Sequence, residues 1–265
     1  MNRFAAHLEM NFGNERSFGE RWQTAAANHF AGCEFVWRLH DVTEVLELQE
    51  KYKMRVACLG GTTGFASGGE RPVLTRPEDR EWLVEDVQKA IGYAQMTSSP
   101  YLVFVPGNLN PDWSLERHRE EALQSFAAVV PYLEKAGVTA VLEPLNSKVD
   151  HPGIYCDTFS EAARLIEQIG SPNVKILYDI YHMQMMGEQL VDSIETHHSL
   201  IGHYHAARVP GRNEPLGGDE SLQAALQAIE KTGYEGFIGL EYKPTGLAEE
   251  SYRELRVQYP SFFHD

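Results

Sequence analysis

The sequence has few cysteines and few basic residues. Its three cysteines, Cys33, Cys58 and Cys156, form no CxxC pair, which is typical of proteins in a reducing compartment and argues against a disulfide-stabilised scaffold. Its 23 lysines and arginines stand against 38 acids, so the formal net charge is −15. Because nucleic acids and anionic membranes attract clustered bases, this deficit argues against both as partners.

Long apolar runs are also missing. No stretch of about 18 apolar residues occurs, although a transmembrane helix needs about that length. The first ten residues are interrupted by Arg3, His7 and Glu9, unlike the apolar segment of a secretion signal. We therefore expect a soluble cytoplasmic protein.

What remains is the composition of one folded domain. With 265 residues, 43% of them hydrophobic, the chain can bury a sizeable core. Barrels of alternating strands and helices fold as one unit at about 250 residues. No linker rich in proline, glycine and serine divides the chain, so we predict a single domain over residues 1–265.

Short apolar runs alternate with segments of helical periodicity. The runs, which are typical of strands, lie at 4–8, 33–37, 54–60, 101–107, 139–145, 174–179, 201–208 and 237–244. The helical segments lie at 18–30 (with Gly32 as the expected stop), 42–52, 77–97, 114–136, 158–169, 190–197, 221–232 and 247–257. This alternation predicts parallel strands and a (β/α)₈ TIM barrel, with its active site at the carboxyl ends of the strands. An open doubly wound sheet is the alternative, disfavoured because no glycine-rich phosphate fingerprint follows the first strand.

Four of the predicted strands end in a side chain that can bind a metal ion. These are Glu143, Asp179, His205 and Glu241, which follow one another at intervals of 36, 26 and 36 residues. A barrel spends roughly 31 residues on each strand–helix unit, so the four fall one to a unit at the same end. Because adjacent strands lie about 4.8 Å apart, these side chains can converge on one point.

Three carboxylates and one imidazole would form an oxygen-rich site. Such a ligand set suits Mn²⁺ or Mg²⁺, with Co²⁺ or Zn²⁺ as alternatives, so we predict one bound divalent metal ion. A ring of salt bridges with Arg208, Arg212 and Lys243 is the structural alternative. The equivalent positions of all four side chains favour the metal site.

Several residues near these strand ends are candidates for binding a substrate. His182 follows the sixth strand closely, although a packed histidine would look the same in the sequence. Arg212 could bind a carboxylate through two guanidinium nitrogens, and Lys243 is the other candidate cation. Glu70, next to Arg71 in a long glycine-rich loop, is either part of a lid or one half of a surface ion pair.

With these residues identified, the chain resembles the hydroxypyruvate isomerase family, within the xylose-isomerase-like barrel superfamily. The resemblance covers nearly the whole chain and is most specific in LEPLN (142–146), YDIYHMQ (178–184), VPGRNEP (209–215) and EYKP (241–244). It implies a barrel that binds one divalent metal ion and interconverts hydroxypyruvate and tartronate semialdehyde. It also implies that Glu143, Asp179, His205 and Glu241 are the ligands, and that Glu143 and Glu241 are the acid/base pair.

Two positions depart from that family. Its members are expected to have glutamine in place of His205 and aspartate in place of Arg208, while related ketose 3-epimerases use histidine at the first position. The resemblance thus implies an isomerase for a small hydroxy-carbonyl or keto-acid substrate, with a ketose 3-epimerase as the alternative. A zinc phosphodiesterase of the endonuclease IV type and a barrel without catalysis are further alternatives. The net charge argues against the former, and the intact Glu143 and Glu241 argue against the latter; a homo-oligomer is left open.

Overall fold

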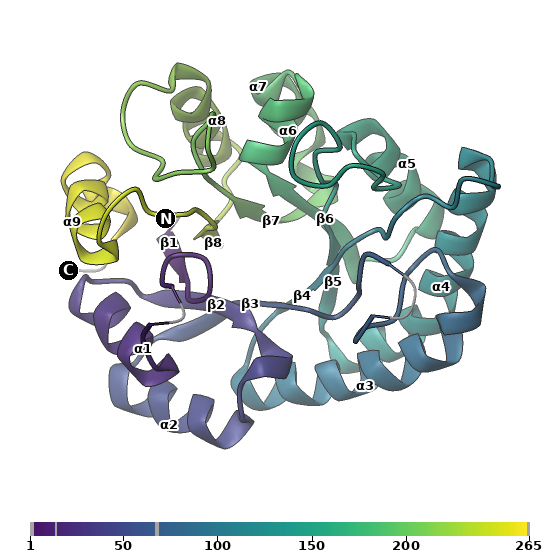
Figure 1. The fold of residues 1–265 in the computed structure, drawn as a ribbon, viewed down its shortest axis with the longest axis horizontal. Helices are drawn as coiled ribbons and strands as arrows, with labels where there is room; N and C mark the ends of the chain where they lie inside the picture. Colours follow the sequence, from purple (N-terminus) through teal and green to yellow (C-terminus); the bar gives the residue numbers. More distant parts are fainter. Residues whose placement is uncertain (1–2, 14, 67–68, 264–265) are drawn as a thin grey trace.

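Eight parallel strands form the centre of the protein. A computed structural model describes residues 3–13, 15–66 and 69–263. The strands pair in chain order, and β8 pairs with β1 to close a barrel (Figure 1). They are β1 (Arg3–His7), β2 (Gly32–Val36), β3 (Arg55–Gly60), β4 (Tyr101–Phe104), β5 (Thr139–Leu142), β6 (Val174–Asp179), β7 (Ile201–His205) and β8 (Phe237–Leu240). The predicted (β/α)₈ barrel is confirmed.

Helices surround the barrel on the outside (Figure 1). They are α1 (Phe18–Ala27), α2 (Val42–Tyr52), α3 (Arg80–Thr97), α4 (Leu115–Ala136), α5 (Phe159–Ile169), α6 (Ile180–Met186), α7 (Leu190–His197), α8 (Glu220–Lys231) and α9 (Ala248–Gln258). Short 3₁₀ turns lie at η1 (Trp37–Leu39), η2 (Pro77–Asp79), η3 (His198–Leu200) and η4 (Pro260–Phe262). Within the described ranges, no helix is both long and apolar enough to cross a membrane.

Side chains cap the first turns of α4 and α5. The Ser114 hydroxyl accepts a hydrogen bond from the N–H of Arg117, and Thr158 accepts one from the N–H of Glu161. Gly137 ends α4 in the left-handed region, with a φ of 68°, as glycine commonly does at this position. Local side-chain chemistry therefore sets where α4 and α5 begin and where α4 ends.

The first helix is shorter than predicted. It ends at Ala27 because Asn28 caps it and His29 turns into the left-handed region, with a φ of 66°. Gly32 is the first residue of β2 and not a helix stop. Glycine is required there because a Cβ atom would lie 2.6 Å from the ring of Phe237 on β8.

The structure adds α6, a helix that the prediction missed. It begins directly after β6, where the Asp179 carboxylate accepts hydrogen bonds from the N–H groups of Tyr181 (2.8 Å) and His182 (3.4 Å). With only seven residues, α6 is too short to show a clear helical period in the sequence. It brings His182 back over the end of β6, one turn beyond Asp179.

The barrel closes between β8 and β1 partly through one buried side chain, Asn11. Its amide donates to the carbonyl oxygens of Leu240 (2.8 Å) and Tyr242 (3.0 Å). Its oxygen accepts from the N–H of His7 and from the Tyr252 hydroxyl, both at 3.0 Å. One amide thus joins the end of β1, the end of β8 and helix α9.

Replacing Asn11 by alanine would leave two buried carbonyl groups and a buried hydroxyl without this partner. We expect Asn11→Ala to lower the free energy of unfolding by about 1–3 kcal/mol, measured by urea denaturation. The control is Asn173→Ala, which removes a single hydrogen bond, from a half-buried side chain to the carbonyl of Val138. Equal small losses in the two variants would contradict the role given to Asn11.

Candidate metal centre and active site

Four side chains at the carboxyl ends of β5 to β8 converge, as their positions in the sequence predict. Ligand atoms of Glu143, Asp179, His205 and Glu241 all lie within 4.8 Å of one another, an arrangement that could hold a metal ion. His205 Nδ1 is 3.0 Å from a Glu241 oxygen and 3.9 Å from a Glu143 oxygen. Glu143 and Glu241 directly follow β5 and β8, whereas Asp179 and His205 end β6 and β7. The four therefore form an arc over half of the barrel mouth.

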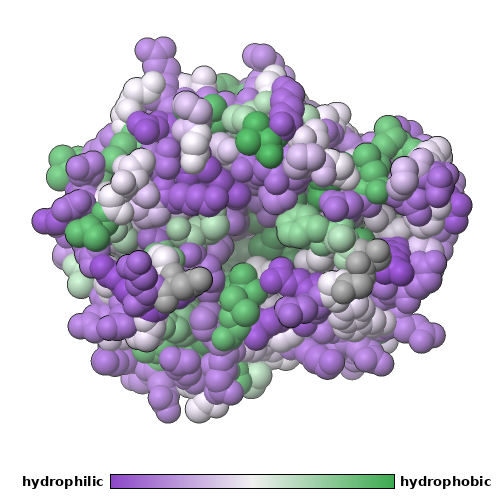
Figure 2. Space-filling model, in the orientation of Figure 1, coloured by the Kyte–Doolittle hydropathy of each residue, from purple (hydrophilic) through white to green (hydrophobic). Residues whose placement is uncertain are grey.

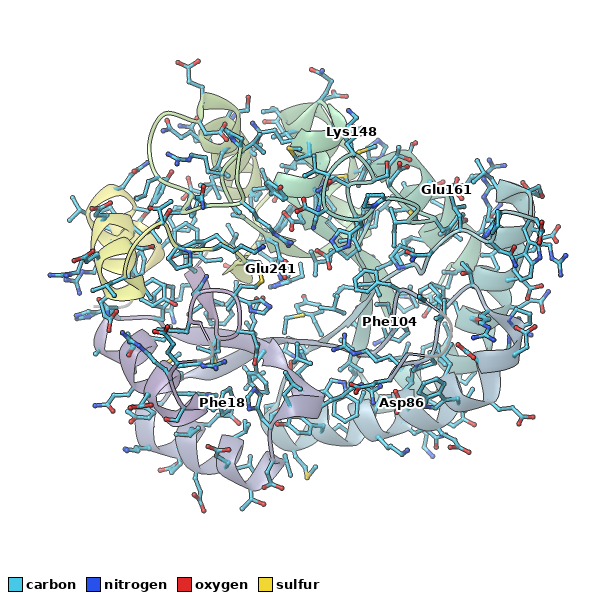
Figure 3. The ribbon with its side chains drawn as sticks, in the orientation of Figure 1. Phe18, Asp86, Phe104, Lys148, Glu161 and Glu241 are labelled. Carbon is cyan, nitrogen blue, oxygen red and sulfur yellow. The ribbon has the colours of Figure 1, made fainter. Side chains whose placement is uncertain are left out.

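Three of these side chains, Glu143, His205 and Glu241, line a small cavity in the mouth of the barrel. Its volume is about 230 Å³, enough for a ligand of a few carbon atoms. Figure 2 shows a hollow in the middle of this face, and Figure 3 shows Glu241 beside it. The wall includes Glu143, His182, His205, Arg212 and Glu241 on one side and Val36, Gly61 and Arg71 on the other.

The cavity concentrates negative charge. Burial, together with the charge of Glu241, raises the pKa of Glu143 to about 8. One Glu143 oxygen is buried without a hydrogen-bond partner in the described part of the chain. Such an atom is costly to bury, and a cation beside it would remove that cost. The donor set and this unpartnered oxygen therefore fit a divalent metal ion.

Arg212 supplies a positive charge to this centre. Its guanidinium is 2.7 Å from a Glu241 oxygen and 3.4 Å from an Asp179 oxygen. Although burial raises the pKa of Glu241, Arg212 and His205 outweigh it and hold that pKa well below its usual value. Glu241 is thereby kept ionised and oriented toward the cavity.

His182 lies in the wall of the same cavity and is fully buried. Its Nδ1 atom accepts a hydrogen bond from the N–H of Asn146 (3.2 Å) and lies 2.7 Å from the amide nitrogen of the same residue. In the neutral ring Nε2 then carries the proton, and burial lowers the pKa of His182 well below its usual value. Nε2 has no hydrogen-bond partner among the described residues, and lies 3.5 Å from Asp179. It is a donor available to a ligand.

A fourth carboxylate, Glu34 at the centre of β2, binds Nε2 of His205. Its two oxygens lie 2.9 Å from His205 Nε2 and 2.7 Å from His203 Nε2. Burial alone would raise the pKa of Glu34, but the two imidazoles lower it to about 2. The ionised Glu34 therefore accepts the Nε2 proton of His205 and leaves Nδ1 facing the other ligands.

Glycine on β8 makes room for this contact. Gly239 pairs with His205 in the register of the sheet. A Cβ atom at Gly239 would lie 2.4 Å from a Glu34 oxygen and 2.6 Å from the His205 ring. Any larger residue would displace the carboxylate or the imidazole.

Not every candidate from the sequence lies at this centre. Lys243 and Glu70 are exposed and do not line the cavity, and Arg208 pairs with Asn213 through its backbone. The sequence also allows a ring of salt bridges with Arg208, Arg212 and Lys243. In the described structure, only Arg212 of these three pairs with any of the four side chains, namely with Asp179 and Glu241.

Other residues of the site were missed in the sequence. Glu34 and His203 lie inside strands β2 and β7, away from the strand ends, and belong to no recognisable motif. Only closure of the barrel brings them together. The alternation of His203 and His205 along one strand was the single available signal, because such residues point to the same face.

The family model of the xylose isomerase-like TIM barrel matches residues 22–258. The chain belongs to this family. Within the xylose isomerase-like family, it is similar to the hydroxypyruvate isomerase of Escherichia coli K12, with 31% identity over 254 residues that cover 96% of this chain and 98% of that protein. It is also similar to the 2-oxo-tetronate isomerase of Cupriavidus necator, with 28% identity over 92% of this chain and 94% of that protein.

A solved structure with a different name has the same fold. The crystal structure of "AP endonuclease, family 2" from Brucella melitensis superposes with a TM-score of 0.89 and 26% identity, over 99% of this chain and 100% of that one. The curated relatives are named as isomerases, and on this similarity the present member of the xylose isomerase-like family is an isomerase. The resemblance seen in the sequence is confirmed at the level of the family.

Glu34 gives a prediction about metal affinity. We expect Glu34→Gln to weaken binding of Mn²⁺ or Co²⁺ by about 10- to 100-fold, because the His205 ring loses its charged acceptor. Competition titration against a chromophoric chelator measures this. In a His205→Gln background the imidazole is gone, so the same Glu34→Gln change should have little further effect. An equal loss in both backgrounds would show that Glu34 does not act through His205.

Proposed function

We propose that the protein is a metal-dependent isomerase of small α-keto acids, with hydroxypyruvate as the substrate and tartronate semialdehyde as the product. One observation carries this proposal: Glu143 and Glu241 stand at the two ends of an arc of four potential ligands around a cavity of about 230 Å³. In that arrangement, a metal ion held by the four ligands can bind oxygen atoms of the substrate, and the two glutamates can exchange protons with adjacent carbons. The names of the curated relatives in Escherichia coli and Cupriavidus necator support the same class of reaction.

The proposed ligands are Glu143, Asp179, His205 and Glu241. Three carboxylates favour a hard ion, Mn²⁺ or Mg²⁺, and His205 also allows Co²⁺ or Zn²⁺. When bound, such an ion acts as a Lewis acid toward the substrate carbonyl and the developing enediolate.

The two glutamates carry the proposed proton transfers. One takes a proton from C3 of hydroxypyruvate and leaves an enediolate across C2 and C3. A proton then returns to C2, and the proton of the C3 hydroxyl passes to the C2 oxygen. C2 thus becomes the carbinol carbon and C3 the aldehyde, with no change in overall composition. Because Glu143 follows β5 and Glu241 follows β8, the two carboxylates reach the cavity from the two ends of the ligand arc, and we assign one as base and the other as acid.

His182 and Arg212 are the proposed substrate contacts on this side of the cavity. The Nε2 proton of His182 has no partner among the described residues and can be donated to a substrate oxygen. Arg212 holds Glu241 and Asp179, and we assign it to the hydroxyl oxygens next to them. Lys243 and Glu70 are exposed to solvent and do not line the cavity, so we assign them no contact with the substrate.

Epimerisation at C3 of a ketose is the second candidate. His205 favours it, because ketose 3-epimerases of the superfamily that the sequence resembles have histidine at this ligand position. Both reactions pass through an enediolate, so the difference lies in the substrate accepted and the carbon that receives the proton.

The glutamates are tested by replacing each with glutamine, which keeps an oxygen ligand but removes the base. Glu143→Gln and Glu241→Gln should each lower kcat by roughly 10²-fold or more, with metal content measured in parallel. The control is Glu121→Gln, a half-buried carboxylate on α4 that pairs with Arg80. Near-normal turnover in either active-site variant would limit that residue to metal binding.

Incubation in D₂O separates isomerase from epimerase. With hydroxypyruvate, we expect tartronate semialdehyde with carbon-bound deuterium, detected by NMR spectroscopy. Free ketoses should remain unlabelled. Deuterium at C3 of a ketose with inverted configuration, together with no turnover of hydroxypyruvate, would overturn the proposal in favour of the epimerase.

A further inference from the structure

The cavity has a positive side as well as a negative one. The four proposed ligands lie at the ends of β5 to β8. The segment that follows β3 contributes Arg71 to the wall of the same cavity. β3 lies across the barrel mouth from β6 and β7 (Figure 1), so this guanidinium faces the ligand arc from the other side.

The Arg71 guanidinium is available to a ligand. In the structure as described, it forms no ion pair and no hydrogen bond, whereas Arg212 is engaged by Glu241 and Asp179. Glu9 is another acid in the cavity wall. Its carboxylate is already bound to His40 (2.7 Å) and to the N–H of Val36 (3.2 Å).

The backbone beneath Arg71 is fixed by a buried ion pair. Arg38 donates hydrogen bonds to the carbonyl oxygens of Gly61 (2.6 Å) and Thr62 (3.3 Å). It also pairs with Asp86 on α3 (Figure 3). Burial lowers the pKa of Arg38, and the nearby charge of Arg71 lowers it further. Asp86 therefore neutralises Arg38. Of the two arginines in the cavity wall, Arg212 is paired with carboxylates and Arg71 has no ion-pair partner among the described residues.

Gly61 lies directly beside the guanidinium. Its φ of 87° is in the region that favours glycine. A Cβ atom built on Gly61 would lie 2.6 Å from a Val36 methyl group, but it would only reach van der Waals contact with Arg71 Cζ, at 3.5 Å. Glycine is therefore favoured by the backbone and by Val36, and Arg71 packs against it.

We propose that Arg71 binds the carboxylate of the substrate, and that this contact selects α-keto acids over neutral ketoses. The inference rests on the proposed function and names the group that recognises its substrate class. A three-carbon keto acid presents a carbonyl and a hydroxyl at one end and a carboxylate at the other. A cavity of about 230 Å³ matches that polarity, because it has an anionic arc on one side and, on the other, a guanidinium without a partner in the described part of the chain.

The contact also explains how a chain with a net charge of −15 would bind an anion. A guanidinium can form two parallel hydrogen bonds to a carboxylate, and no such bond exists for the hydroxymethyl group of a ketose. Arg212 was the cation expected from the sequence. Its two carboxylate partners leave it less suited to this task than Arg71.

A matched pair of ligands tests the inference. Hydroxypyruvate and dihydroxyacetone differ only in that a carboxylate in the first is a hydroxymethyl group in the second. Their binding to the metal-loaded protein is measured by calorimetry, and turnover of hydroxypyruvate is followed separately. The variants are Arg71→Gln and Arg71→Lys, with Arg76→Gln as the control, since Arg76 pairs with Glu78 and Asp79. Thermal melting establishes that each variant is folded.

For Arg71→Gln we expect hydroxypyruvate to bind roughly 10- to 100-fold more weakly, with a matching rise in KM and kcat within a few-fold. Arg71→Lys should lose less, because lysine keeps the charge but not the paired hydrogen bonds. Dihydroxyacetone binding, and all properties of Arg76→Gln, should be unchanged.

The outcomes separate this inference from the proposed function. Equal weakening of both ligands, or no weakening of hydroxypyruvate, would overturn the carboxylate site. Arg71-dependent binding of hydroxypyruvate without turnover in the unmodified protein would support the carboxylate site and contradict the proposed reaction.

Discussion

The site is organised by the repulsion between carboxylates that the barrel forces together. Glu143, Asp179 and Glu241 converge at the ends of β5, β6 and β8, and Glu34 adds a fourth acid behind His205. Like charges at this separation in a buried place raise the pKa of at least one member, as happens at Glu143. A divalent cation, helped by Arg212, is the simplest means of keeping all of them ionised.

The fold meets this constraint with residues around the site that do not themselves react. Gly239 leaves the space in which Glu34 and His205 meet, and Gly61 packs beside Val36 and Arg71. Asn11 ties β8 to β1 near Glu241. The result is a cavity with opposite charges on its two sides, which suits a small polar anion better than a neutral sugar.

The sequence was enough to predict the barrel, because eight apolar runs alternate with helical segments. It also predicted the four strand-end residues, since their spacing follows the strand–helix unit. It could not predict α6, which begins where the Asp179 carboxylate accepts hydrogen bonds from the N–H groups two and three residues later. Glu34 and His203 lie 169 residues apart, and only closure of the barrel joins them. The sequence likewise does not show that Arg212 pairs with Asp179 and Glu241, or that Arg71 lies on the other side of the cavity, because both depend on the three-dimensional structure.

The metal content of the protein tests the central claim most directly. The protein is dialysed against a chelator, then titrated with Mn²⁺ while its melting temperature and bound metal are recorded. We predict that metal-free protein is inactive, that binding saturates at about one ion per chain, and that the melting temperature rises as the ion fills the site. Full activity and an unchanged melting temperature in metal-free protein would contradict a metal centre at the ends of β5 to β8.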